Sequence, residues 1–208
     1  MTFSVHGKGR QRVLMVSERL VTARLTLRPL ESVDWPAIHE FTSDAEVQRY
    51  ISGAPLSQQE TRDLIEMLCD WGREVPPRAR PFAFVHTAEN RVIGFGGLYW
   101  TGSGKRWQAE LGYTLHHDYW RQGYTSEAGT ALVRFGFTEL HLHRIFAECH
   151  PDNMGSAGVM RRLGMRYEGW MREAEWSGSE WWDMLHYAIL EHEWRHAEHV
   201  RLTSGSAG

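Results

Sequence analysis

The middle of the chain alternates strand, loop, helix and strand, and this alternation constrains the fold more than any other feature. Strands are expected over residues 110–115 and 144–150, and a helix is expected between them over residues 126–140. The two strands of such a βαβ unit are parallel and adjacent. A second helix is expected over residues 155–163, ended by Gly164.

Further strands surround this unit. Three consecutive strands are expected over residues 82–87, 92–100 and 107–115, and they would form an antiparallel meander that leads into the unit. The turns between them are expected at Glu89-Asn90 and Gly102-Ser103-Gly104. After the unit the pattern predicts two more strands and an amphipathic helix, over residues 165–170, 181–190 and 191–199.

The first part of the chain predicts one strand and two helices. Residues 24–29 alternate polar and apolar side chains and stop at a proline, which is typical of a strand. Asp34 is expected to cap a short helix that ends near Thr42. Ser57 begins a capping box, so a longer helix is expected over residues 57–71.

Length and composition indicate one domain. The chain has 208 residues, of which 42% are hydrophobic and 24% charged, and this composition suits one core. We expect a flexible N-terminal tail over residues 1–17, a single domain over residues 18–199 and a flexible C-terminal tail over residues 200–208. The formal net charge of -3 provides no basic field for phosphates, so direct nucleic acid binding is not expected.

Cysteine and histidine usage argues against a secreted or metal-binding protein. Cys69 and Cys149 have neither metal-ligand spacing nor the density of a disulfide scaffold, which indicates a reducing cytoplasm. No apolar run is long enough for a membrane span, and the first ten residues lack the apolar region of a signal peptide. The twelve histidines show no recognised ligand spacing, so no metal is expected.

The segment from Tyr119 to Glu127 joins an expected strand to the start of an expected helix. A helix N-terminus presents unpaired N–H groups and a partial positive charge, which favour phosphate, and Gly123 lets the main chain approach a ligand closely. On these residues alone, Gly123 is equally explained as a turn residue and Ser126 as a helix cap.

The neighbouring residues favour the anion site, because this segment resembles the coenzyme A pyrophosphate loop of the GNAT superfamily. That loop is usually written as Arg or Gln, two residues, Gly, one residue, then Gly or Ala, and Gly123 matches its central glycine. Trp120 stands in place of the leading Arg or Gln, and Thr125 in place of the final small residue. A leading tryptophan resembles the Rim branch, which acetylates the N-terminal amines of ribosomal proteins.

Further matches to the same family follow in order along residues 24–190. They are Arg24-Leu25-Thr26-Leu27-Arg28-Pro29-Leu30, Ala109-Glu110-Leu111-Gly112-Tyr113, Leu142-His143-Arg144-Ile145, Pro151-Asp152-Asn153-Met154-Gly155-Ser156 and Arg162-Leu163-Gly164-Met165. Each is weak alone, and their shared order carries the resemblance.

The resemblance implies the GNAT fold, an α+β (α/β) domain with a mixed central sheet of six to seven strands and helices on both faces. Its fourth and fifth strands splay apart, and the pantetheine of acetyl-CoA would lie between them. The residues implied to contact the cofactor are Tyr113, Thr114 and Leu115 on the strand, Arg121, Gln122, Gly123, Tyr124, Thr125 and Ser126 in the loop, and Asn153. From its sequence context alone, Asn153 is equally a turn residue.

Acetyl transfer needs a neutral amine, a donor for the developing oxyanion and a proton for the departing thiolate. The family's usual acid, a tyrosine, is replaced here by Met160, and the resemblance assigns the acid to Ser156 one turn earlier. Ser156 could instead cap its helix. Glu148 matches a family base and is slightly preferred over Glu110. Alternatively, a water chain could remove the proton, and either carboxylate could instead form a surface ion pair.

The implied function is acetyl-CoA-dependent transfer of an acetyl group to a primary amine, with the N-terminal α-amine of a protein or peptide as the expected acceptor. A small amine such as a polyamine, an antibiotic or an amino-acid derivative remains open, as does a non-catalytic acetyl-CoA-binding module. The tryptophans of the late hairpin fit either a wall of the acceptor groove or a homodimer contact; they are Trp170, Trp176, Trp181 and Trp182.

Overall fold

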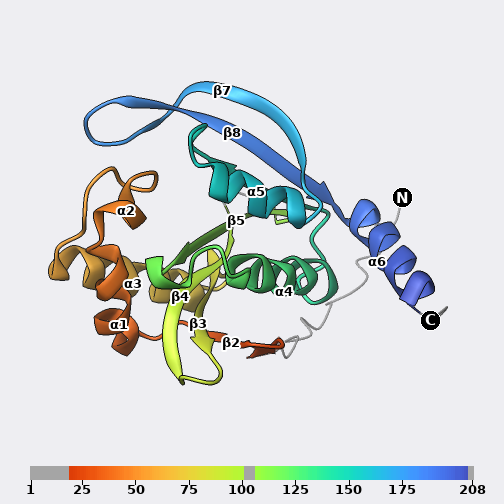
Figure 1. The fold of residues 1–208 in the computed structure, drawn as a ribbon, viewed down its shortest axis with the longest axis horizontal. Helices are drawn as coiled ribbons and strands as arrows, with labels where there is room; N and C mark the ends of the chain where they lie inside the picture. The colour runs from red at the N-terminus through yellow and green to blue at the C-terminus, as the bar shows by residue number, and fades with distance from the viewer. Residues whose placement is uncertain (1–18, 101–105, 206–208) are drawn as a thin grey trace, which may run out of the picture.

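The computed structural model describes residues 19–100 and 106–205, with side chains described as far as residue 200, and contains one mixed sheet of eight strands (Figure 1). In spatial order the strands are β1 (Leu20–Val21), β2 (Leu25–Pro29), β3 (Ala79–His86), β4 (Arg91–Tyr99), β5 (Gln108–Leu115), β6 (Arg144–Cys149), β8 (Trp181–Leu190) and β7 (Arg166–Trp176). The α-helices are α1 (Trp35–Thr42), α2 (Ala45–Gln48), α3 (Gln58–Arg73), α4 (Tyr124–Thr138), α5 (Met154–Arg162) and α6 (Glu191–Gly205), with short 3-10 turns at η1 (Ser32–Asp34) and η2 (His117–Tyr119).

The sheet topology confirms the predicted fold class. Strands β3, β4 and β5 form the antiparallel meander, and β5 and β6 are the parallel pair that flanks the crossover helix α4. The strand count exceeds the expected six to seven because the two-residue strand β1 pairs with β2 at the sheet edge. No helix in the described part of the chain is long and apolar enough to cross a membrane.

Helices cover both faces of the sheet, because alternate strand residues supply two cores. Phe82 and Phe84 of β3 belong to the core that packs against α4 and α5. Ala83, between them, belongs to a second core on the opposite face, where α1 and α3 contribute Ile38 and Ile65. In Figure 1 the helices α1 to α3 group at one end of the view and α6 lies at the other.

The capping predictions have different outcomes. The box at the start of α3 is confirmed: the Glu60 N–H donates to Ser57 Oγ at 3.3 Å, and the Ser57 N–H donates to the Glu60 carboxylate at 2.7 Å. The prediction that the Asp34 side chain caps α1 is wrong. Asp34 holds the N-cap position, but its carboxylate accepts two bonds from Arg28, at 2.6 and 2.8 Å, and one from the Glu31 N–H. A bidentate guanidinium is a stronger partner than a helix N–H.

Several element boundaries also differ from the expectation. Helix α4 begins two residues before the expected Ser126, because Gly123 serves as its N-cap. Strand β7 continues to Trp176, and α6 runs through Gly205 into the segment expected as a tail. Gly164, with φ +82°, ends α5 as predicted. The expected turn at Gly102-Ser103-Gly104 and the tail over residues 1–17 lie outside the described residues.

Strands β5 and β6 part soon after they meet, as the resemblance implied for the fourth and fifth strands of the family; the extra β1 shifts the numbering by one. Their described pairing covers Gln108 to Glu110 on β5 and Arg144 to Phe146 on β6. Beyond it, β5 continues beside β4 as far as Leu115, whereas β6 continues beside β8. The sheet is therefore open between the carboxyl ends of β5 and β6.

The glycines of β4 hold the other side of β5 close. A Cβ atom on Gly96 would lie 2.5 Å from the carbonyl oxygen of Gly112 in β5, and one on Gly97 would lie 2.2 Å from the carbonyl oxygen of Arg80 in β3. Because both contacts are with the main chain, any side chain here would displace a neighbouring strand. The meander therefore fixes the position of β5.

Candidate functional site

The loop after β5 ends in a helix N-terminus without a side-chain cap. Gly123 occupies the N-cap position with φ +85°, and Arg121 also has a positive φ, of +58°. No side chain caps the helix, so the N–H groups at Tyr124, Thr125 and Ser126 remain available. Three aligned N–H groups at the positive end of a helix form a site for an anion.

Trp120, which departs from the usual motif, ties this loop to the end of β5. Its indole N–H donates to the Leu115 carbonyl oxygen at 2.9 Å. Gln122 adds a second tie, because its side-chain amide donates to the Asp118 carbonyl oxygen at 2.8 Å. The loop is therefore held by its own side chains beside the opening between β5 and β6.

The main chain of β5 presents alternate residues to that opening. The Thr114 carbonyl oxygen faces β4, since a Cβ atom on Gly94 would lie 2.6 Å from it. Backbone groups on a strand alternate in direction, so those of Tyr113 and Leu115 face the β6 side. Since Trp120 already occupies the Leu115 carbonyl, the groups left for a ligand are the Leu115 N–H and both groups of Tyr113.

Ser156, whose helix is capped by Asn153, meets Tyr113 on the face of the sheet covered by α5. Asn153 is the N-cap of α5, and its Oδ1 accepts from the Ser156 N–H at 3.0 Å. The Ser156 hydroxyl therefore does not cap the helix, which contradicts that alternative; its Oγ lies 2.9 Å from the Tyr113 hydroxyl. Burial raises the pKa of Tyr113 despite the hydrogen bond from Ser156, so the phenol keeps its proton. Met160 is buried in the core.

The two candidate carboxylates lie on the opposite face of the sheet. Ala109 and Leu111 point into the core under α4, so Glu110 between them points away from it, and Glu148 follows the same pattern on β6. Burial, together with the nearby charges of Glu148 and Glu175, raises the pKa of Glu110 to about 7. A carboxyl group that titrates near neutral pH can exchange a proton with a substrate.

Glu148 differs from Glu110 because it has a partner. Its Oε1 lies 2.8 Å from Nδ1 of His186, whose ring stacks on Phe146 at 5.2 Å. Arg144 donates to the other ring nitrogen of His186 at 3.0 Å and also pairs with Glu168. Sequence reasoning missed His186, because its only signal is the register that sets it opposite Glu148 in the pairing of β6 with β8.

Just beyond the end of β6, aromatic side chains from two segments that are distant in the sequence pack on His150. Tyr50, which follows α2, stacks on His150 at 5.1 Å, and His150 packs edge-on against Trp182 of β8 at 5.3 Å. Trp182 is buried, whereas the other hairpin tryptophans are more than half exposed; they are Trp170, Trp176 and Trp181. The early helical region and the late hairpin therefore meet at His150, two residues after Glu148.

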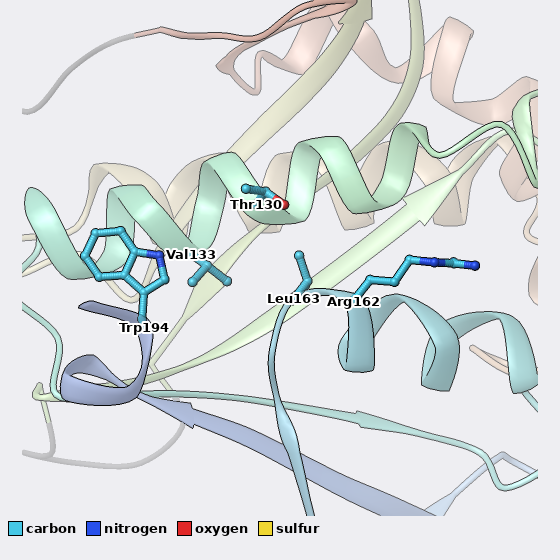
Figure 2. Close-up of a pocket in the computed structure, with 5 residues that line it drawn as sticks. All are labelled: Thr130, Val133, Arg162, Leu163 and Trp194. Atoms are coloured by element: carbon cyan, nitrogen blue, oxygen red, sulfur yellow. The ribbon is translucent and has the colours of Figure 1, made fainter. Parts of the chain in front are cut away.

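A small cavity lies between α4, α5 and α6, away from this site (Figure 2). Its lining residues come from the middle of α4 and from the ends of the other two helices; they are Thr130, Val133, Arg162, Leu163 and Trp194. Its volume of about 20 Å³ suffices for a single water molecule. Among the residues that the structure describes, no group of three His, Cys, Asp or Glu side chains could hold a metal ion.

Comparison with known proteins gives a consistent assignment. A family model described as an acetyltransferase (GNAT) domain matches residues 24–166. The uncharacterized N-acetyltransferase YnaD of Bacillus subtilis (strain 168) is 35% identical over 175 residues, covering 84% of this chain and 98% of YnaD. The solved structure of a GNAT-family acetyltransferase from Bacillus anthracis is 34% identical, with a TM-score of 0.73, and covers 84% of this chain and 99% of that one.

A more distant relative has a named activity. The [ribosomal protein uS5]-alanine N-acetyltransferase of Escherichia coli (strain K12) is 27% identical over 113 residues, which covers 54% of this chain and 58% of that protein.

The raised pKa of Glu110 predicts a pH-dependent stability. Between the ordinary pKa of 4.5 and about 7 the unfolded chain loses the proton of Glu110 and the folded protein keeps it, so stability falls as pH rises. We expect Glu110→Gln to unfold like the wild type near pH 4 and to be more stable above pH 8, by about 3 kcal/mol. Urea unfolding across this range measures the difference. Glu66→Gln, at an exposed position on α3, is the control, and an equal gain there at pH 8 would contradict the assignment.

Proposed function

Since this chain belongs to the GNAT family and is an acetyl-CoA-dependent N-acetyltransferase, we propose that its acceptor is the N-terminal α-amine of a protein or peptide. The observation that carries this proposal is Glu110, a buried carboxyl group whose pKa of about 7 is close to that of an α-amine and which stands beside the opening between β5 and β6.

The cofactor would bind along the parted strands. We assign its pyrophosphate to the N–H groups of the loop from Arg121 to Ser126, with Asn153 beside it. Its pantetheine would lie between β5 and β6, where Tyr113 and the Leu115 N–H face the opening. The Leu115 N–H is also the donor best placed for the oxyanion, because it lies at the end of the strand and the carbonyl of that residue is already occupied.

Two side chains would handle the protons of the reaction. The amine nitrogen attacks the thioester carbonyl carbon, the carbon–sulfur bond breaks, and the thiolate takes a proton from Ser156, whose hydroxyl is oriented by Tyr113. Glu110 takes the proton that the amine loses and releases it to solvent, and Ser156 recovers its proton from solvent, so that both groups return to their starting states. We prefer Glu110 over Glu148 as the base, the reverse of the sequence preference, because His186 pairs with Glu148 and no cause that shifts the pKa of Glu110 lowers it.

Proton affinity favours an α-amine over a lysine side chain. An α-amine with a pKa near ~8 is roughly a tenth neutral at pH 7, whereas lysine near ~10.4 is neutral only at about the 10⁻³ level. A base with a pKa of about 7 is well matched to an α-amine, whose pKa is close to its own. It is far weaker than the base that a lysine side chain would need. The named activity of the Escherichia coli relative, on an alanine of a ribosomal protein, supports the same choice.

A small polyamine is the second candidate, because the charges of Glu148 and Glu175 are close enough to raise the pKa of Glu110, and the charge of Glu148 also raises the pKa of Glu175. Their charges are not all available, however, since Glu148 is bonded to His186. One mainly uncompensated buried carboxyl group matches one ammonium group better than a polycation.

Gly123→Ala should weaken binding of coenzyme A, because a side chain at φ +85° strains the loop and displaces the N–H groups that would hold the pyrophosphate. Gly164→Ala is a matched control: its φ is +82°, and the nearest atom to the added Cβ is again 3.4 Å away. Both variants should lose about 1 kcal/mol of stability, and only Gly123→Ala should raise the Kd, by about tenfold or more. Calorimetry with coenzyme A measures this; equal Kd values for the two variants would refute the loop assignment.

Ser156→Ala should lower kcat while leaving the Kd for acetyl-CoA nearly unchanged, since the proton is needed in the transition state. General acid catalysis is worth about 10² to 10⁴ in rate. Tyr113→Phe removes only the hydroxyl that orients Ser156, so its loss should be smaller. Single-turnover kinetics separates chemistry from product release. A larger loss in Tyr113→Phe than in Ser156→Ala would transfer the acid role to the tyrosine.

The acceptor is tested with peptides that carry one free α-amine and one internal lysine, incubated with acetyl-CoA and analysed by tandem mass spectrometry. We expect acetylation at the α-amine, and a Glu110→Gln variant should lose most of this activity at pH 7. Spermidine and an aminoglycoside, assayed by thiol release, are the comparison substrates. Predominant lysine acetylation, or activity restricted to the polycations, would overturn the proposed acceptor.

A further inference from the structure

The first turn of α4 contains a carboxylate that an anion site would not be expected to tolerate. Glu127 lies one residue after the free N–H groups of the loop, and its own N–H makes the first helical bond to the Gly123 carbonyl. A negative charge at this distance from a pyrophosphate would weaken binding by repulsion. The side chain is largely buried, so solvent screens this charge poorly.

Arg24, immediately before β2, neutralises that carboxylate with a fixed geometry. Its Nε donates to Glu127 Oε2 at 2.7 Å, and its main-chain N–H donates to Glu127 Oε1 at 2.7 Å. The Thr22 hydroxyl donates to the same Oε1 at 2.7 Å. Burial opposes the charge of Glu127, but these hydrogen bonds outweigh it, so the pKa lies below its ordinary value and the group stays ionised.

The same guanidinium also holds the loop itself. Its Nη1 donates to the Gln122 carbonyl oxygen at 3.0 Å, and its Nη2 lies 3.4 Å from where a Cβ of Gly123 would stand. The guanidinium carbon lies 4.2 Å from the ring centre of Tyr124, the first residue of α4. Arg24 thus contacts Gln122 and Tyr124, on either side of Gly123, from a position just before β2 and about a hundred residues earlier in the sequence.

We propose that Arg24 is a positioning residue for acetyl-CoA: it clamps the loop of residues 121–126 to β2 and cancels the charge of Glu127, so that the helix N-terminus can accept a pyrophosphate. The inference rests on the proposed cofactor site. It assigns a binding role to an arginine that lies far from the loop in sequence and outside the glycine motif.

A second arginine, within β2, serves as an internal control. Arg28, four residues further along, pairs with Asp34 through two bonds of 2.6 and 2.8 Å and so ties β2 to η1. This pair is more buried than that of Arg24 with Glu127. Breaking it should therefore cost at least as much stability without touching the loop.

The test is a double-mutant cycle on the Kd of coenzyme A, measured by calorimetry in the full chain with the variants Arg24→Gln, Glu127→Gln and the double variant. Arg24→Gln removes the cationic partner of Glu127 beside the ligand and should raise the Kd by about tenfold or more. Glu127→Gln alone should raise the Kd by only a few-fold. This variant loses the ion pair that anchors Arg24, but it also removes the repulsion between Glu127 and the pyrophosphate. In the Arg24→Gln background the second change should lower the Kd again, because it removes the uncompensated charge.

Each outcome decides between distinct hypotheses. An Arg24→Gln variant within about twofold of the wild-type Kd, or a double variant weaker than Arg24→Gln, would overturn the proposal. Arg28→Gln should lower the melting temperature and leave the Kd within about twofold. If it raised the Kd as much as Arg24→Gln does, the effect of Arg24 would be explained by overall stability alone. If a cycle variant fails to fold, Thr22→Val, which removes one bond to Glu127, should still raise the Kd, and an unchanged Kd there would overturn the proposal. A wild type that does not bind coenzyme A would instead refute the cofactor site itself.

Discussion

The separation of β5 from β6 is the constraint on which the rest of the site depends. Two parallel strands that paired along their whole length would satisfy each other's main chain and leave no groups for a ligand. Here each strand keeps a full partner on its other side, β4 for β5 and β8 for β6, so the sheet stays intact while its centre opens. The antiparallel pairing of β5 with β4, which runs from Glu110 to Leu115, holds β5 on the side away from the opening.

This opening also explains why the two halves of the proposed chemistry lie on different faces of the sheet. The hydroxyls of Tyr113 and Ser156 meet under α5, whereas Glu110 and Glu148 point to the other face. Side chains alternate along a strand, so neighbouring residues on β5 reach opposite sides of one gap. A thioester lying in the gap would have a proton donor on one side and a proton acceptor on the other.

Local features of the site could be predicted from sequence, and features that depend on long-range pairing could not. The glycine loop and the capping box at Ser57 follow from residues within a few positions of one another, and the βαβ unit follows from the order of three consecutive elements. The partner of Glu148 is 38 residues away, and it becomes visible only when β6 and β8 are in register. Asp34 is a different case: its competing partner Arg28 is only six residues away, but it reaches the carboxylate only because of the turn at η1.

Charge compensation links the loop to the acceptor side. At the loop the carboxylate of Glu127 is held by Arg24 and Thr22 and stays ionised, whereas at the acceptor side burial keeps Glu110 near the point of titration. The two carboxylates follow the same physical rule with opposite results, because only one has donors around it. An ionised Glu110 is unfavourable in the empty site, and an ammonium group would relieve that cost on binding. In the proposed reaction, acceptor binding and proton removal would both involve Glu110: a bound ammonium group would stabilise the ionised carboxylate, and transfer of its proton to that carboxylate would leave the neutral amine.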